Sequence, residues 1–139
     1  MEILQSQSTS NPTSISQVAA EAALSGDQTC MEPMIKAFRE RHAYVVKTFN
    51  EIPGLSCIEA EGAFYAFPDA RKAIESLFNK KILKEKNDLA LADYLLEKEG
   101  IAVVPGSAFG TEGYFRISFA TSMKNLTEAL TRIKRALSV

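Results

Sequence analysis

The chain of 139 residues contains only one histidine and two cysteines, and this scarcity excludes several kinds of site. A single histidine, His42, cannot build a histidine-rich zinc centre, and it argues against a His-based catalytic triad. Cys30 and Cys57 lack Cys-x-x-Cys spacing, so they predict neither a disulfide framework nor a four-cysteine metal site. Two reduced thiols are typical of the reducing cytosol, and we therefore expect a cytoplasmic location.

The sequence also lacks an excess of charge of either sign and any long apolar run. Its 16 Lys and Arg against 17 Asp and Glu give a net charge of −1. That balance excludes a generic polyanion binder, because phosphate contacts need a basic excess on one face. The apolar runs are far shorter than a membrane span, and residues 1–14 are polar rather than a signal peptide. We expect one globular domain that binds neither nucleic acid nor a membrane.

The chain begins with polar residues and continues with two predicted helices. Residues 1–12, rich in Ser, Thr, Gln and Asn, predict an extended lead-in to a domain over residues 13–139. We expect Asn11 as the N-cap of the first helix and Pro12 as its first residue. Ser25-Gly26 should end this helix, because a glycine commonly follows the last residue of a helix. Apolar residues at helical spacing predict a longer helix over residues 32–50.

Strands and helices are mixed along the rest of the chain. Apolar patterns and turn residues predict strands at 55–58, 63–67, 101–104 and 114–119, and helices at 70–79, 89–99 and 122–137. The first two strands should form a hairpin, the strand at 101–104 should be buried, and Gly100 should end a helix in the left-handed conformation. Ser122 should cap the last helix, in which Leu126, Leu130, Ile133 and Leu137 form an apolar stripe. Four lysines between residues 80 and 86 indicate a solvated connection. The economical packing of this order is α+β, with a small sheet covered on one side by helices.

The last predicted strand, residues 114–119, carries the residue that we single out for function. Period-2 alternation places Phe115 and Phe119 on one face and Arg116 on the other. A guanidinium held by a sheet has limited freedom, and it offers a planar fork suited to bidentate carboxylate binding. An ordinary ion pair between Arg116 and Glu112 is the alternative that the residues alone leave open.

Two further segments near the predicted strands were candidates for chemistry. The loop 105–113 contains three glycines and Phe109, so its backbone could approach a ligand closely. It lacks the Gly-Lys-Ser/Thr ending of a phosphate-binding loop. The segment 62–67, Gly-Ala-Phe-Tyr-Ala-Phe, faintly resembles the aromatic strand of RNA-recognition domains, but Glu61 stands where that motif has Lys or Arg. Core packing of these aromatic residues is the better interpretation.

Several strings of the sequence resemble, in the same order, the aspartate aminotransferases of the prokaryotic-type class I pyridoxal-phosphate-dependent family. They are Gln5-Ser6-Gln7-Ser8-Thr9-Ser10, Ile15-Ser16-Gln17, Gly62-Ala63-Phe64-Tyr65, Val104-Pro105-Gly106-Ser107-Ala108-Phe109-Gly110 and Arg116-Ile117-Ser118-Phe119-Ala120-Thr121-Ser122. The resemblance runs from about residue 4 to residue 137. It implies the C-terminal third of such an enzyme: a small α+β domain with a three- to four-stranded, mainly antiparallel sheet, and the helix that connects it to the large domain.

The resemblance also implies which parts of the enzyme this chain lacks. The large domain would lie upstream and would carry the lysine that forms a Schiff base with pyridoxal phosphate, in a Ser-x-x-Lys turn, together with most phosphate ligands. No lysine of this chain follows a strand in a Ser-rich turn. The cofactor would therefore be bound mainly by the large domain. The family works as homodimers with shared active sites, and we expect the same here.

Residue by residue, the resemblance assigns Arg116 to the family arginine that grips the substrate α-carboxylate. Phe109 matches a loop aromatic residue near the substrate. Ser10 and Asn11 match a Ser-Asn-Pro segment that reaches toward the partner subunit's site. In one branch of the family an arginine four residues before that serine binds the side-chain carboxylate of the substrate. Here Ser6 occupies that position, so recognition of the distal carboxylate must come from elsewhere.

The implied reaction is the transfer of an amino group from L-aspartate to 2-oxoglutarate through pyridoxal phosphate, giving oxaloacetate and L-glutamate. This chain alone would be inactive. Two other interpretations of the sequence remain. One is a free-standing module that uses Arg116 to bind an amino or keto acid without chemistry. The other is a structural or interaction domain in which Arg116 forms an ordinary ion pair.

Overall fold

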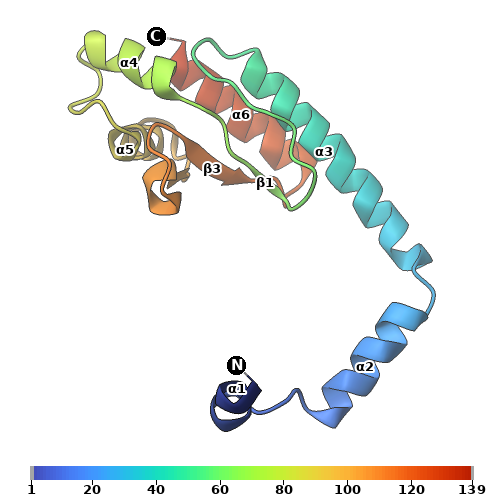
Figure 1. Cartoon of the computed structure of the whole chain (residues 1–139). Coiled ribbons are helices and arrows are strands. Elements are labelled where there is room, and N and C mark those ends of the chain that lie inside the picture. The colour runs from blue at the N-terminus through green and yellow to red at the C-terminus, as the bar shows by residue number, and fades with distance from the viewer. Residues whose placement is uncertain (1, 139) are drawn as a thin grey trace. The chain divides into compact units, whose positions relative to one another are not determined.

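The computed structural model describes residues 2–138 and divides into two compact units, residues 1–35 and residues 36–139. In chain order the elements are α1 (Glu2–Ser8), α2 (Ser14–Ser25), η1 (Thr29–Met31), α3 (Glu32–Asn50), β1 (Tyr65–Ala66), α4 (Arg71–Asn79), α5 (Asp88–Glu99), β2 (Val104–Pro105), η2 (Gly106–Phe109), β3 (Phe115–Ser118) and α6 (Met123–Leu137) (Figure 1). None of the helices in the described part of the chain is both long enough and apolar enough to cross a membrane.

The first unit is helical from its start. Glu2–Ser8 forms α1, which corrects the extended conformation that we expected for residues 1–12. A polar composition does not by itself oppose a helix: glutamine and leucine are good helix formers, and Glu2 in the first turn faces the positive end of the helix dipole. Ser10, with a φ of 57°, takes the chain out of the helical path.

The N-cap of α2 differs from the predicted one. Thr13, not Asn11, caps the helix, and its Oγ1 atom accepts a hydrogen bond from the N–H of Ser16 at 3.4 Å. Pro12 therefore precedes the cap instead of opening the helix. The end of α2 is as predicted, because Gly26 follows its last residue and closes the final turn with its own N–H.

The second unit contains a three-stranded antiparallel sheet in the order β1-β3-β2. This arrangement confirms the predicted α+β class and the small antiparallel sheet. The register places Tyr65 of β1 opposite Ser118 and Val104 of β2 opposite Arg116. The central strand β3 thus joins two short edge strands that come from distant parts of the chain.

Residues 55–58 do not form the predicted strand or its hairpin. Ser56 makes an isolated antiparallel bridge with Asp69 instead. The side-chain amide of Asn50, at the end of α3, binds both the N–H and the C=O of Cys57 at 2.9 Å. These long-range partners satisfy the backbone of the segment without a hairpin.

The predicted strand at 101–104 is also shorter than expected. Only Val104 of that range is in a strand, and β2 extends to Pro105. Val104 and Ala102 are exposed, so this segment is not the buried strand that its apolar sequence suggested. Its apolar residues alternate between a half-buried and an exposed environment, as they do in an edge strand with one covered face.

One apolar core joins the sheet to the helices α3 to α6. Phe49 of α3 meets Phe115 of β3 edge to face, with ring centroids 5.7 Å apart. The predicted apolar stripe of α6 is buried, as its pattern indicated: Leu126, Leu130, Ile133 and Leu137. The caps of two helices also confirm the prediction, since Ser122 caps α6 at the N–H of Asn125 and Gly100 ends α5 with a φ of 65°.

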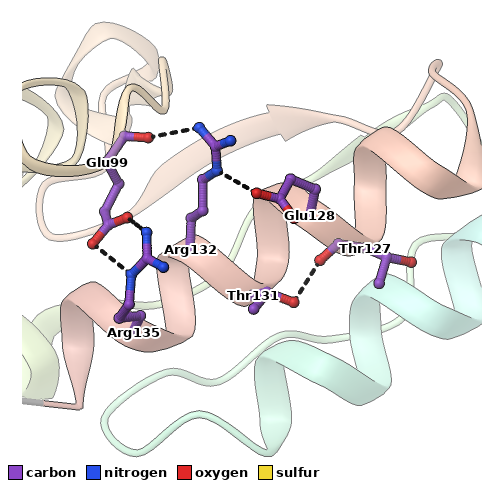
Figure 2. A network of polar contacts seen from close by, with 6 residues as sticks. All are labelled: Glu99, Thr127, Glu128, Thr131, Arg132 and Arg135. Carbon is purple, nitrogen blue, oxygen red and sulfur yellow. Dashed lines mark hydrogen bonds and ion pairs between the residues drawn. The ribbon is translucent and has the colours of Figure 1, made fainter.

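A polar network fastens α5 to α6 (Figure 2). The buried carboxylate of Glu99, the last residue of α5, accepts hydrogen bonds from the Nε and Nη2 atoms of Arg135. Arg132 donates from Nη1 to the backbone oxygen of Glu99 at 3.2 Å and from Nε to Glu128 at 2.8 Å. The hydrogen bonds and charge of Arg135 hold the pKa of Glu99 below its usual value, despite the burial of that carboxyl.

Candidate functional site

The strand β3 positions Arg116 as the alternation predicted. Phe115 and Phe119 are buried, with 0% and 2% of their surfaces exposed, whereas Arg116 is half-buried on the opposite face. Glu112 is exposed, and no carboxylate among residues 2–138 forms an ion pair with Arg116. The alternative of an ordinary pair with Glu112 therefore has no support within the described chain.

Two aromatic rings hold the guanidinium of Arg116 instead. Its Cζ atom lies 4.3 Å from the ring centroid of Tyr65 and 4.2 Å from that of Phe109. Both distances fall within the range of cation–π attraction. Tyr65 reaches Arg116 because it pairs with Ser118 across the sheet, and paired residues lie on the same face. Arg116, two residues before Ser118, also lies on that face.

The turn η2 brings Phe109 to the guanidinium. Gly106, at its start, is tightly enclosed: a Cβ atom there would lie 2.3 Å from the backbone oxygen of Thr111 and 2.7 Å from the Cβ of Tyr114. Gly110, with a φ of 77°, ends the turn in the left-handed region. Two of the glycines that we noted in this loop therefore serve the geometry of its turn.

A buried carboxylate holds the same turn. Asp88, at the start of α5, is 1% exposed, and its Oδ2 atom accepts a hydrogen bond from the N–H of Ser107 at 2.6 Å. Burial by itself would raise the pKa of Asp88, but its hydrogen bonds with Ser107 and with the backbone of Asp88 itself and of Gly113 together place that pKa below the usual value. The carboxylate is therefore charged at neutral pH and anchors the loop to α5.

A row of aromatic side chains extends from Phe109 to Arg71. The ring of Phe67 meets Phe109 at 86° and stacks on Tyr114 at 20°, with centroids 6.2 and 5.2 Å away. Arg71 lies over Tyr114 at 5.4 Å and forms an ion pair of 2.5 Å with Asp69. The hydrogen bonds from Arg71 hold the pKa of Asp69 below its usual value, against the effect of its partial burial.

A cavity of about 300 Å³ opens beside this cluster, and its wall includes Tyr65, Phe67 and Tyr114. Arg116 does not line it.

The other predicted site residues lie in the first unit. Ser10 and Asn11 are exposed, and they follow the end of α1. The structure brings Arg116 and Phe109 together, and the roles of all four predicted site residues remain predictions.

The histidine and the cysteines take no part in this cluster. His42 packs against Phe119, with ring centroids 5.5 Å apart, and its Nε2 atom accepts a hydrogen bond from the N–H of Ala60 at 3.1 Å. Cys57 is buried, which raises the pKa of its thiol, while Cys30 is exposed. The described residues contain no group of three His, Cys, Asp or Glu that could hold a metal ion.

The sequence did not indicate Tyr65 and Asp88 as parts of the site. Tyr65 belongs to the segment that we assigned to core packing, and only the pairing of β1 with β3 shows that it faces Arg116. Asp88 stands at the start of a helix, where acidic residues are common for electrostatic reasons alone. Local sequence patterns indicate the roles of Tyr65 and Asp88 only weakly, because these roles depend on contacts with residues far away in the sequence.

The model of one protein family matches almost the whole of this chain. The profile described as "Aminotransferase class I and II" matches residues 1–133. The chain therefore belongs to the class I and II aminotransferase family, whose enzymes depend on pyridoxal phosphate.

Within this family the chain is similar to aspartate aminotransferases. It is 60% identical over 138 residues to the aspartate/prephenate aminotransferase of Nitrosomonas europaea, a match that covers 99% of this chain and 35% of the relative. It is 46% identical over 135 residues to the aspartate aminotransferase of Bacillus subtilis, covering 97% of this chain and 33% of the relative. The chain thus spans about a third of the length of the curated relatives that it matches.

Solved structures agree with this assignment. The crystal structure of the aspartate aminotransferase from Rhizobium meliloti superimposes with a TM-score of 0.81 at 42% identity, covering 98% of this chain and 34% of that one. The aromatic aminotransferase from Pyrococcus horikoshii superimposes with a TM-score of 0.80 at 34% identity, again over 98% of this chain and 34% of that one.

The residues described here do not by themselves make a site for pyridoxal phosphate. The ten lysines of the sequence lie on the helices α3 to α6 or in the connection 80–86. In the described chain, the cation that lies against Tyr65 and Phe109 is Arg116 and not a lysine.

Proposed function

We propose that this chain is the C-terminal domain of a pyridoxal-phosphate-dependent aspartate aminotransferase, in which Arg116 binds the α-carboxylate of the substrate. The observation that carries the proposal is the guanidinium on β3, held between Tyr65 and Phe109 with no carboxylate partner in the described chain. The similarity to relatives named as aspartate aminotransferases supports the same conclusion.

The chemistry of Arg116 fits this role. A planar guanidinium can donate two parallel hydrogen bonds to one carboxylate, and this geometry fixes the direction of the substrate as well as its position. Once the α-carboxylate is fixed, the amino group of the amino acid can be aimed at the cofactor. Such orientation accelerates the reaction between two bound groups. The cofactor supplies the electron sink when it is bound, and the residues of this chain supply orientation.

Aspartate and 2-oxoglutarate are the substrates that we propose, with oxaloacetate and glutamate as products. The Nitrosomonas relative carries prephenate in its name as well, and prephenate is a second substrate to test. Ser6 is neutral, so the side-chain carboxylate of aspartate would be bound by a residue other than the one used in the arginine-bearing branch.

The proposal includes the remainder of the enzyme. A large domain of the same protein would bind the cofactor, two subunits would form a homodimer in the cytoplasm, and Ser10 and Asn11 would lie toward the partner subunit's site. The domain formed by this chain would move as a lid over the bound substrate. Sequencing the coding DNA upstream of Met1 tests this organisation directly. An open frame that encodes a Ser-x-x-Lys turn supports it, whereas a promoter and start codon at Met1 would favour a separate binding module.

The role of Arg116 is tested by Arg116→Lys in the complete protein. Lysine keeps the charge but loses the fork, and the loss of charge-assisted hydrogen bonds should lower kcat/KM for aspartate about 10- to 100-fold. Binding of pyridoxal phosphate, followed by its absorbance, should be unchanged. Arg39→Lys, on the exposed surface of α3, is the matched control. Near-normal turnover of Arg116→Lys would contradict the assignment.

A further inference from the structure

We propose that Tyr65 is a positioning residue for Arg116, a role that rests on the proposed function of that arginine. The Cζ atom of Arg116 lies within 4.3 Å of the centroids of both Tyr65 and Phe109. If the rings of Tyr65 and Phe109 lay on the same side of this Cζ atom, they would be in contact with each other at these distances. No contact between those two rings occurs in the described chain, whereas other ring pairs meet at 4.4 to 6.4 Å. The two rings therefore approach the guanidinium from different directions, and we call this pair of rings the clamp.

The two sides of this clamp differ in how firmly they are held. Phe109 is 47% exposed and lies at the end of a short turn. Tyr65 is half-buried in β1, paired with β3 itself, and its ring contacts that of Phe64 with centroids 4.4 Å apart. The strand that carries Arg116 thus also fixes Tyr65, so the tyrosine is the rigid side of the clamp.

The clamp determines how a carboxylate can approach. The N–H donors of a guanidinium lie in its plane and point outward from its edge. The two rings shield part of the guanidinium, so a carboxylate binds to the N–H donors that stay accessible along its edge. The side chain of an unclamped arginine has several rotatable bonds, and binding would first have to select one rotamer. Tyr65 therefore reduces the ordering required when substrate binds.

The test uses the complete protein with its cofactor bound. We would compare wild type with Tyr65→Leu, which removes the ring, and Tyr65→Phe, which keeps it. The hydroxyl of Tyr65 has no hydrogen-bond partner in the described chain, so the phenylalanine variant retains the relevant contact. Phe78→Leu is the matched control, since this exposed phenylalanine on α4 has no ring contact in the described residues. Succinate, a dicarboxylate without an amino group, is the binding probe.

The expected results separate positioning from stability. Calorimetric titration should show that Tyr65→Leu binds succinate about 3- to 10-fold more weakly, as expected when one long side chain must be ordered on binding. The KM for aspartate should rise similarly, with a smaller change in kcat. Tyr65→Phe should stay within about twofold of wild type, because the ring face is what attracts the cation. A purely structural role would reduce the amount of active protein and hence the apparent kcat, and would leave KM unchanged.

The same experiment includes Arg116→Lys, so that the two proposals can fail separately. Weak succinate binding by Arg116→Lys together with wild-type binding by Tyr65→Leu would overturn the positioning role and leave the role of Arg116 intact. Wild-type binding by Arg116→Lys would overturn the proposed function itself. If Tyr65→Leu does not fold, Tyr65→Met replaces it, and failure of both to fold would show that Tyr65 is a structural residue instead.

Discussion

Asp88 carries a buried negative charge, which would be energetically unfavourable without the hydrogen bonds that its carboxylate accepts. It is almost fully buried, and no cation forms an ion pair with it in residues 2–138. Its partner is the N–H of Ser107, in the turn that carries Phe109. A single carboxylate thus links the start of α5 to one wall of the clamp around Arg116.

We expect Asp88→Asn to destabilise the domain by about 1–3 kcal/mol, the usual cost of disturbing a buried hydrogen bond. The pKa of Asp88 is lowered in the folded protein, so its contribution to stability is fully present above the unfolded pKa and is lost as the pH falls through the folded value. Thermal unfolding of both proteins between pH 3 and 7 checks this. The gap in Tm should be present at pH 7 and shrink toward pH 3. Asp93→Asn, on the exposed face of α5, should show no gap.

At the residue scale, the sequence indicated Arg116 and Phe109 but not Tyr65 or Asp88. Alternation along one strand assigns a face to each residue, and it placed Arg116 correctly opposite Phe115. The contact with Tyr65 depends on the register between β1 and β3, and no local pattern encodes that register. Asp88 was missed for the same reason, since its partner Ser107 lies 19 residues away in the sequence.

Among the elements, helices were predicted better than strands. The residues that end or cap a helix are local, and Gly100 and Ser122 acted as expected. The errors at 55–58 and 101–104 arose where backbone partners are distant, as with Ser56 and Asp69. A polar composition likewise misled us for residues 1–12, because it predicts exposure and not backbone conformation.

The polar network between α5 and α6 gives a prediction at the scale of secondary-structure elements. Glu99→Gln removes the charge that accepts hydrogen bonds from Arg135, and it should lower the Tm of the domain. Because the pKa of Glu99 is lowered in the folded protein, its stabilising effect should be complete above about pH 4.5 and disappear as the pH falls below that. Differential scanning calorimetry from pH 3 to 7 measures this difference. Glu97→Gln, an exposed change on the same helix, should behave as wild type at every pH.

The whole molecule consists of two units that differ in how they are stabilised. None of the residues in α1 or α2 is buried, and Ile15 and Val18 are 82% and 66% exposed. The second unit, in contrast, contains the entire buried core of the described chain. Exposed apolar helices of this kind are expected to contact other parts of a larger protein, which agrees with the proposed large domain.

A chain shortened to begin at residue 36 should therefore fold. Its Tm should equal that of the full chain within about 3 °C, since the removed residues contribute no buried side chain. Circular dichroism in the near and far ultraviolet during heating provides the measurement. A markedly lower Tm or a loss of the cooperative transition would show that residues 1–35 stabilise the core after all.

The two rings on Arg116 also affect how much water surrounds its charge. The two rings occupy part of the space around the guanidinium that water would otherwise fill. A carboxylate that binds Arg116 therefore has fewer water molecules to displace. Part of the water that an ion pair would have to displace from the guanidinium is thus already removed when the domain folds. The free-energy cost of removing this water is met during folding and not during binding.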